Sequence, residues 1–272
     1  QMQVFNPEST QLFSNLNLLG FISLMAWGLG YVGQPHILAR FMAAENTKKL
    51  VSARRIAMFW MVLVLLGSVA TGMAGIAYFG QQPLSNPETV FITLSQQLFN
   101  PWVAGIITAA ILSAIMSTID SQLLVSSSVI SEDFYRVFVR PEATEKELLM
   151  VSRIAVIIIA ILALVIASDR ESRVLDLVSY AWAGFGASFG PVIVFSLFWR
   201  NMTALSALAG MIVGSVTVVL WSNLSGGIFD LYEIVPGFVL ASIVIIAISL
   251  LKPTVNKQSV QRFEEVELII NS

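Results

Sequence analysis

The sequence has 272 residues, of which 56% are hydrophobic and 12% are charged, and its formal net charge is −2. A soluble domain carries about 25% charged residues, so this composition, with a mean hydropathy of +0.80, indicates an integral membrane protein. The chain has no cysteine and one histidine, His36, which excludes disulfide frameworks, thiolate metal sites and multi-histidine metal sites. The sequence shows no basic face of the kind that binds nucleic acid.

Long apolar runs with almost no charge predict seven transmembrane helices. A membrane-spanning helix needs about 20 mostly apolar residues, and runs this long and uniform are not those of barrel strands. The segment 80–101 between the second and third spans carries only Glu88 as a charged residue, and we expect it to form a lid or a short interfacial helix. The predicted spans lie within 11–39, 56–79, 102–130, 149–168, 177–199, 204–223 and 234–251.

The first span contains WGLGYVGQP, from Trp27 to Pro35. A helix interior loses about 1 kcal/mol with each glycine and about 3 kcal/mol with a proline, so the three glycines and Pro35 predict a broken helix. In secondary transporters such breaks lie near the middle of the membrane and hold the substrate. Trp27 and Tyr31, four residues apart, would share a helix face. The alternative is that the glycines only allow close helix packing.

The third span carries a stripe of hydroxyl side chains. Ser113, Ser117 and Ser121 recur every fourth residue and therefore share one helix face, with Thr118 and Asp120 beside them. Hard cations prefer several oxygen ligands, so the stripe is a candidate sodium site. Small hydroxyl residues at this spacing also allow helices to pack closely. A carboxylate within a span predicts a functional site, although Asp120 would have an ordinary role if it were hydrated or paired near the surface.

The fifth span contains SYAWAGFGASFGPV, in which glycines and a proline again interrupt the apolar run. This pattern is typical of a gate helix and equally of a tight packing seam, and the sequence does not separate the two. The polar edges of this segment come from Ser179, Tyr180 and Trp182.

Lysine and arginine residues are concentrated in alternate loops. Thirteen of the 15 follow the first, third, fifth and seventh spans, and only Arg170 and Arg173 lie in the other loops. Cytoplasmic loops carry the excess of positive charge. We therefore expect the N-terminus of the chain outside the membrane and its C-terminal tail in the cytoplasm.

Several stretches together resemble the sodium/solute symporter family, in particular its bacterial proline-transporting members. They are WGLGYVGQPHILARFMAA with the following basic loop, SAIMSTIDSQLLVSSSVISEDFY, LVSYAWAGFGASFGPV and YEIVPGF, and they occur in the family's order. The resemblance implies an all-α LeuT-type fold with two inverted five-helix repeats. On this basis residues 1–199 are the second repeat, with its broken first helix at about 11–39, residues 200–251 are two additional transmembrane helices, and residues 252–272 are a cytoplasmic tail. The N-terminal half of the transporter would be the missing partner.

The resemblance also implies two binding sites. The sodium site takes the carbonyl of Ala114 and the side chains of Ser117 and Thr118, and its remaining ligands come from the missing half. Asp120 stands where some relatives carry serine, so Asp120 and Ser121 are second-tier candidates. The proline site takes Trp27, Tyr31 and Pro35, with Gln34 alongside. The gate or hinge positions are Gly28, Gly30, Gly33, Gly184 and Gly186.

The implied function is secondary active transport: sodium-coupled uptake of L-proline across a bacterial cytoplasmic membrane, with sodium as the coupling ion and no other cofactor. A symporter of another small solute would share the fold, and a truncated fragment without transport activity of its own is a further alternative. A membrane-embedded enzyme would need paired catalytic groups, and Asp120 is the only carboxylate well inside a predicted span.

Overall fold

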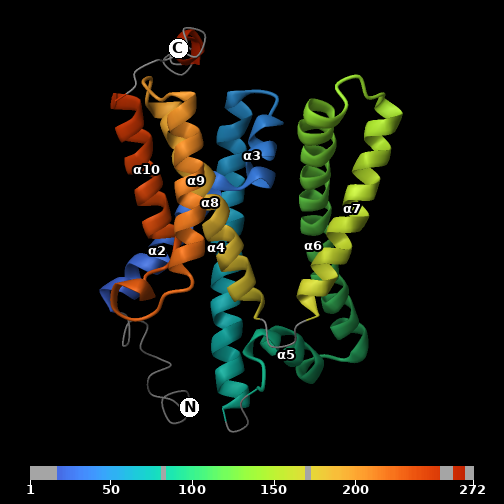
Figure 1. The fold of residues 1–272 in the computed structure, drawn as a ribbon. Coiled ribbons are helices and arrows are strands. Elements are labelled where there is room, and N and C mark those ends of the chain that lie inside the picture. Colours follow the sequence, from blue (N-terminus) through green and yellow to red (C-terminus); the bar gives the residue numbers. More distant parts are fainter. Residues whose placement is uncertain (1–16, 81–83, 169–172, 252–259, 267–272) are drawn as a thin grey trace. The chain divides into compact units, whose positions relative to one another are not determined.

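The computed structural model describes residues 17–80, 84–168, 173–251 and 260–266, and all regular elements in these ranges are helical (Figure 1). The chain divides into two compact units, and each is described here by itself. Within the described residues, the first unit covers 43–80 and 84–162, and the second covers 17–42, 163–168, 173–251 and 260–266.

The first unit begins with the long helix α4, Thr47–Phe79, which Asn46 caps by accepting a hydrogen bond from the Lys49 N–H at 2.9 Å. The short helices η2, Pro87–Thr89, and α5, Val90–Leu98, follow it. A Cβ at Gly75 would overlap the Val90 side chain, so α5 packs closely on α4. The short helix expected in 80–101 is therefore present.

Helix α6, Pro101–Ser128, continues directly into a π-helix, η3, Val129–Val139. The Asn100 side chain caps α6 by accepting from the Val103 N–H at 3.0 Å. The predicted third span ended at about residue 130, so the π-helical extension was not predicted. Helix α7, Glu145–Ala167, returns after a short turn.

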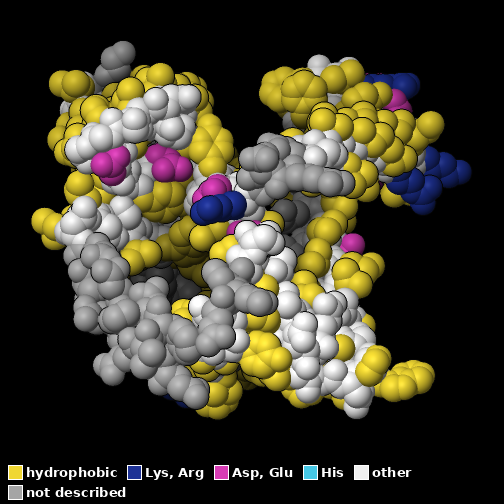
Figure 2. Space-filling model, turned by 90° about the horizontal axis from the view of Figure 1, so that it is seen from below, with side chains coloured by type: hydrophobic (Ala, Val, Ile, Leu, Met, Phe, Trp, Pro, Cys, Tyr) yellow, Lys and Arg dark blue, Asp and Glu magenta, His cyan; other side chains and the backbone are white. Residues whose placement is uncertain are grey.

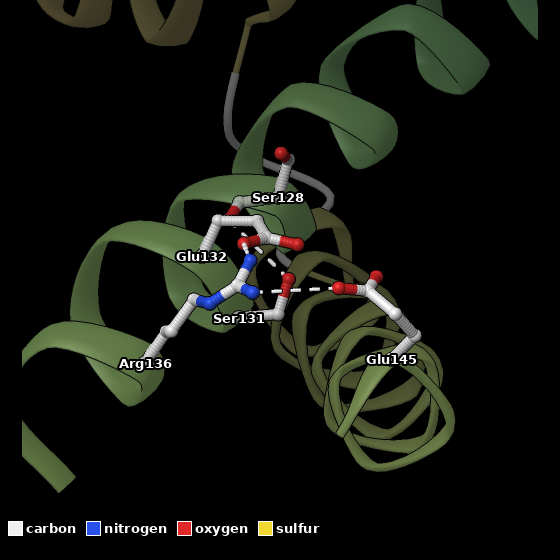
Figure 3. A network of polar contacts seen from close by, with 5 residues as sticks. All are labelled: Ser128, Ser131, Glu132, Arg136 and Glu145. Atoms are coloured by element: carbon white, nitrogen blue, oxygen red, sulfur yellow. Dashed lines mark hydrogen bonds and ion pairs between the residues drawn. The ribbon is translucent and has the colours of Figure 1, made fainter. Parts of the chain in front are cut away.

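Ionic contacts connect η3 to the start of α7. The Arg136 guanidinium lies between two carboxylates, 2.8 Å from that of Glu132 and 3.4 Å from that of Glu145 (Figure 3). The adjacent Tyr135 hydroxyl donates to the Glu147 carboxylate at 2.8 Å, which holds the same two elements together. Together these contacts hold η3 against the first turn of α7.

The second unit is a bundle in which α2 packs against α8 and α10, and α9 packs against α8 and α10 (Figure 1). Small residues allow the helices to approach closely, as is usual in membranes: a Cβ at Gly214 would overlap the Ala187 carbonyl, and one at Gly237 would lie 2.7 Å from the Ala187 Cβ. The elements are α2 Leu18–Gly33, α3 Pro35–Met42, α8 Val174–Phe198, α9 Ala204–Trp221, η4 Gly227–Asp230 and α10 Ile234–Leu251.

Six of the described helical segments are long and apolar enough to cross a membrane, against seven predicted spans. They are α4, α6 with η3, α7, α8, α9 and α10, and each overlaps one predicted span. The first predicted span instead contains α2, an apolar helix of only 16 residues. Figure 2 views the molecule from below, toward the ends of the helices, and hydrophobic side chains cover much of the described surface there while charged side chains are few.

The C-terminal tail is described only at residues 260–266, which are helical. Glu264 in this segment forms an ion pair with Arg200 at 2.9 Å, which ties the tail to the turn between α8 and α9. The rest of the tail lies outside the described residues.

Candidate substrate and sodium sites

The first predicted span is broken at one residue. Helix α2 ends at Gly33, Gln34 has extended backbone angles (φ −82°, ψ 115°), and α3 begins at Pro35. A proline disfavours helical backbone in the residue before it, so Pro35 explains the conformation of Gln34. The helix runs without interruption through Gly28 and Gly30, and the break is therefore narrower than the glycine pattern suggests.

The side chain of Gln34 is buried at this break, with 4% of its surface exposed. Its amide nitrogen, Nε2, has no hydrogen-bond partner among the described residues. Leaving a buried donor without a partner costs about 1–3 kcal/mol, and such a group in a native structure is commonly explained by a functional role or a bound water or ion. Gln34 thus presents two unused N–H donors where the helix is interrupted.

The aromatic residues of α2 meet Trp182 from α8. The Trp182 ring is stacked on that of Trp27, with centroids 5.7 Å apart and planes 16° apart, and it meets the Tyr31 ring edge-on at 4.8 Å. The Trp182 indole N–H donates to the Trp27 carbonyl oxygen at 3.0 Å. One side chain from α8 therefore contacts both aromatic residues predicted for the proline site.

Trp27 has a second aromatic neighbour, Tyr232, which precedes α10. Their ring centroids are 6.0 Å apart and the planes differ by 18°. Trp27 itself is half-buried, whereas Tyr31 is 41% exposed. The Tyr31 ring is thus the more accessible of the two predicted substrate-binding rings.

Three of the predicted hinge glycines form the contact between α2 and α8. A Cβ at Gly30 would overlap the Trp182 indole, one at Gly33 would overlap the Phe185 carbonyl, and one at Gly186 would lie 2.8 Å from the Gly30 Cα. These positions have the geometry of a packing seam, and their hinge role stays a prediction. The other two predicted positions have no atom within 4 Å of such a Cβ: Gly28 and Gly184.

The predicted sodium ligands lie on one turn of α6 in the first unit. The Thr118 hydroxyl donates to the Ala114 carbonyl at 3.3 Å, and the Ser121 hydroxyl donates to the Ser117 carbonyl at 2.9 Å. A hydroxyl that donates its hydrogen still has lone pairs for a cation. Ala114, Ser117, Thr118 and Asp120 are all exposed, so this stripe of oxygens is open to a partner or an ion.

The model of the family described as "Sodium:solute symporter family" matches residues 1–214, which is most of the chain. The chain belongs to the sodium:solute symporter family. Members of this family are transporters rather than enzymes.

Individual symporters of the family are about half identical to the chain. It is 52% identical over 271 residues to the sodium/proline symporter of Haemophilus influenzae, with 96% of the chain and 54% of the relative covered. The Escherichia coli sodium/proline symporter is 52% identical over 96% of the chain and 53% of the relative. The Bacillus subtilis high-affinity proline transporter PutP is 48% identical, with 98% and 57% covered. The chain spans about half the length of these curated relatives, and no solved structure matches it.

Two residues that contact Trp27 in the candidate substrate site, Trp182 and Tyr232, were not predicted from the sequence to belong to it. Trp182 was noted only as a polar edge of the fifth span, and Tyr232 only as part of YEIVPGF. Both are aromatic residues inside quoted family stretches, and that is the only sequence signal that pointed to them. Their contacts with Trp27 join segments 155 or more residues apart, and helical periodicity does not predict such contacts.

Proposed function

We propose that this chain is the C-terminal part of a sodium-coupled symporter that takes up L-proline. The observation that carries the proposal is the buried, partnerless amide of Gln34 at the break between α2 and α3. The identity of about 50% to sodium/proline symporters from three bacteria supports it. No enzymatic step is part of the proposal.

In this proposal the break binds zwitterionic proline. The Gln34 amide donates to the substrate carboxylate, which satisfies the buried N–H groups and adds a charge-assisted hydrogen bond of about 1.5–3 kcal/mol. The pyrrolidine ring packs against Trp27 and Tyr31, and the more exposed Tyr31 ring also attracts its ammonium group. Pro35 keeps the helix open, so that the last carbonyls of α2 lack helical partners and remain available to the ligand.

Sodium binds to α6 through the Ala114 carbonyl and the hydroxyls of Ser117 and Thr118. Two oxygens about 2.4 Å from a hard cation and at right angles to each other are about 3.4 Å apart. The 3.3 Å between the Ala114 carbonyl and the Thr118 hydroxyl suits such a pair. Asp120 and Ser121 are second-tier ligands, and the missing N-terminal half supplies the rest.

Coupling requires that sodium bind the proline-competent, outward-open state better than the alternative state. Neutral ligands leave the bound ion's charge uncompensated, so the membrane potential acts on it. One charge crossing 100 mV gains about 2.3 kcal/mol, and a tenfold sodium gradient adds about 1.4 kcal/mol. Together they sustain a roughly 400-fold accumulation of proline.

The proposed architecture is the second half of a LeuT-type inverted-repeat transporter in a bacterial cytoplasmic membrane. The pair α2 and α3 is the broken first span of the repeat, and residues 1–199, 200–251 and 252–272 are the repeat, the two additional helices and the cytoplasmic tail. Among the described residues of α4 only Gly75 is buried. The exposed faces of α4, α6 and α7 are where the N-terminal half packs.

The test is sodium-dependent uptake of labelled proline into vesicles. The chain alone is compared with a fusion in which it follows the N-terminal part of the Haemophilus influenzae sodium/proline symporter. We expect uptake by the fusion and none by the chain alone. The variant Trp27→Ala in the fusion should weaken proline binding at saturating sodium.

The other outcomes separate the alternatives. A fusion whose uptake of labelled proline is inhibited more strongly by another amino acid than by unlabelled proline indicates a different solute. Uptake by the chain alone would contradict the assignment of the remaining sodium ligands to the N-terminal half. A fusion that reaches the membrane and takes up no proline would overturn the proposal.

A further inference from the structure

The segment YEIVPGF, residues 232–238, has no role in the proposed transport site. It begins just before α10 and includes the first residues of that helix, and it is distant in sequence from the broken helix. Its first residue, Tyr232, nevertheless makes three contacts with α2 and α8, the two helices that meet at the break.

Two of these contacts go to α2. The Tyr232 ring lies nearly parallel to the ring of Trp27, at a centroid distance of 6.0 Å. The Tyr232 backbone N–H donates to the Ser23 hydroxyl at 3.0 Å, one helical turn before Trp27. Tyr232 is therefore fixed to α2 at two points, and one of them is a predicted proline-binding ring.

The third contact goes to α8. The Tyr232 hydroxyl donates to the Ser179 carbonyl at 2.7 Å, three residues before Trp182. Burial and the neighbouring Glu233 both raise the pKa of Tyr232 far above its usual value. The phenol therefore remains neutral and keeps the hydrogen that it donates to α8.

We infer that Tyr232 is a positioning residue for the substrate site: it holds the Trp27 ring in place by bridging α2 and α8 from the start of α10. This rests on the proposed role of Trp27 in binding proline. Tyr232 does not touch the substrate, so its removal changes affinity through the orientation of Trp27.

The first test measures the proline KM and Vmax of the fusion transporter at saturating sodium. A pair of aromatic rings corresponds to about a 2- to 12-fold effect on an equilibrium constant. We expect Tyr232→Leu to raise KM by about 5-fold, with Vmax per transporter at the membrane within about 2-fold of wild type. Tyr232→Phe keeps the ring beside Trp27 but loses the hydrogen bond to α8, so its KM should lie between those of wild type and Tyr232→Leu.

Phe229→Leu provides the matched control. Phe229 lies in η4, three residues before Tyr232, and its ring contacts Trp221 at 4.8 Å instead of Trp27. We expect its KM to equal that of wild type. If Phe229→Leu raises KM as much as Tyr232→Leu does, or if Tyr232→Leu leaves KM unchanged, the inference is wrong.

A second test does not depend on transport. With 5-fluorotryptophan incorporated at Trp27 of the full chain in detergent, the fluorine NMR line should shift or broaden in Tyr232→Leu and stay in place in Phe229→Leu. A line unchanged by Tyr232→Leu would overturn the positioning role. A fusion without any proline uptake but with the expected NMR change would reject the proposed function and keep the contact between Tyr232 and Trp27.

Discussion

The Gln34 side chain is a polar group that the protein buries without using it internally. Its Nε2 lacks a partner among the described residues, although the side chain is almost fully enclosed. Such an arrangement costs stability in the empty state, and a ligand that accepts the hydrogen bonds recovers that cost. Under the proposed role of Gln34 in binding proline, stability and function are therefore opposed at this position.

The variant Gln34→Leu tests this opposition. Leucine fills a similar space without an N–H group, so the chain should gain up to about 1–3 kcal/mol in stability, measured as thermal unfolding in detergent without proline. In the fusion the same variant should lose proline affinity by at least about 10-fold, because the carboxylate loses its donor. A variant that is less stable and binds proline normally would contradict the role of Gln34.

The hydroxyl stripe of α6 allows a separate test of sodium binding. Ser117→Ala and Thr118→Ala each remove an oxygen ligand, so the sodium concentration for half-maximal uptake should rise about 10-fold, while proline recognition at saturating sodium changes less. Ser113→Ala serves as the control, because Ser113 shares the stripe without being an assigned ligand. Unchanged sodium dependence in both Ser117→Ala and Thr118→Ala would show that the site assignment is wrong.

The glycines in the contact between α2 and α8 allow these two helices to approach closely. Gly186 faces the Gly30 backbone, whereas Gly184, two residues earlier on α8, faces open space. Gly186→Ala should destabilise the chain by about 1–3 kcal/mol through overpacking. Gly184→Ala should be neutral or stabilising by up to about 1 kcal/mol, because alanine favours helix. Thermal unfolding in detergent compares the two, and equal losses would contradict the seam.

The helices could be predicted well from the sequence where one property decides them. The apolar runs predicted the ends of α4 and of α7 to α10 to within a few residues, because a membrane-spanning helix requires length and low charge. The exception is the start of α4, whose polar N-terminal turns lie outside the apolar run. The extension of α6 into η3 could not be predicted, since its Glu132 and Arg136 spacing is also that of an ordinary α-helix.

The candidate substrate site could be predicted only where its residues are neighbours in the sequence. Trp27, Tyr31 and Pro35 stand together in one unusual stretch, so the break in α2 and its aromatic residues were accessible to sequence analysis. Trp182 and Tyr232 join that site only through tertiary contacts. The contact of Gly30 with Trp182 explains one of the glycines better than the break does.

The orientation of the whole chain is testable by labelling, because the sequence contains no cysteine. Single cysteines at Ser85→Cys and Glu142→Cys lie in exposed turns on alternate sides of the predicted membrane. The excess of basic residues around Glu142 predicts that only Ser85→Cys reacts with an impermeant maleimide added to intact cells. Permeabilised cells provide the control for reactivity, and the reverse labelling pattern would overturn the orientation.

The pairing of α2 with α8 also has a consequence for biosynthesis. The 155 residues between Trp27 and Trp182 take roughly 8–30 s to synthesise at ribosomal rates. During that time α2, only 16 residues long and ending at the break at Gln34, has neither α8 nor α10 to cover Gly30 and Gly33. The nascent chain must therefore keep α2 beside the translocon or an insertase until α8 emerges.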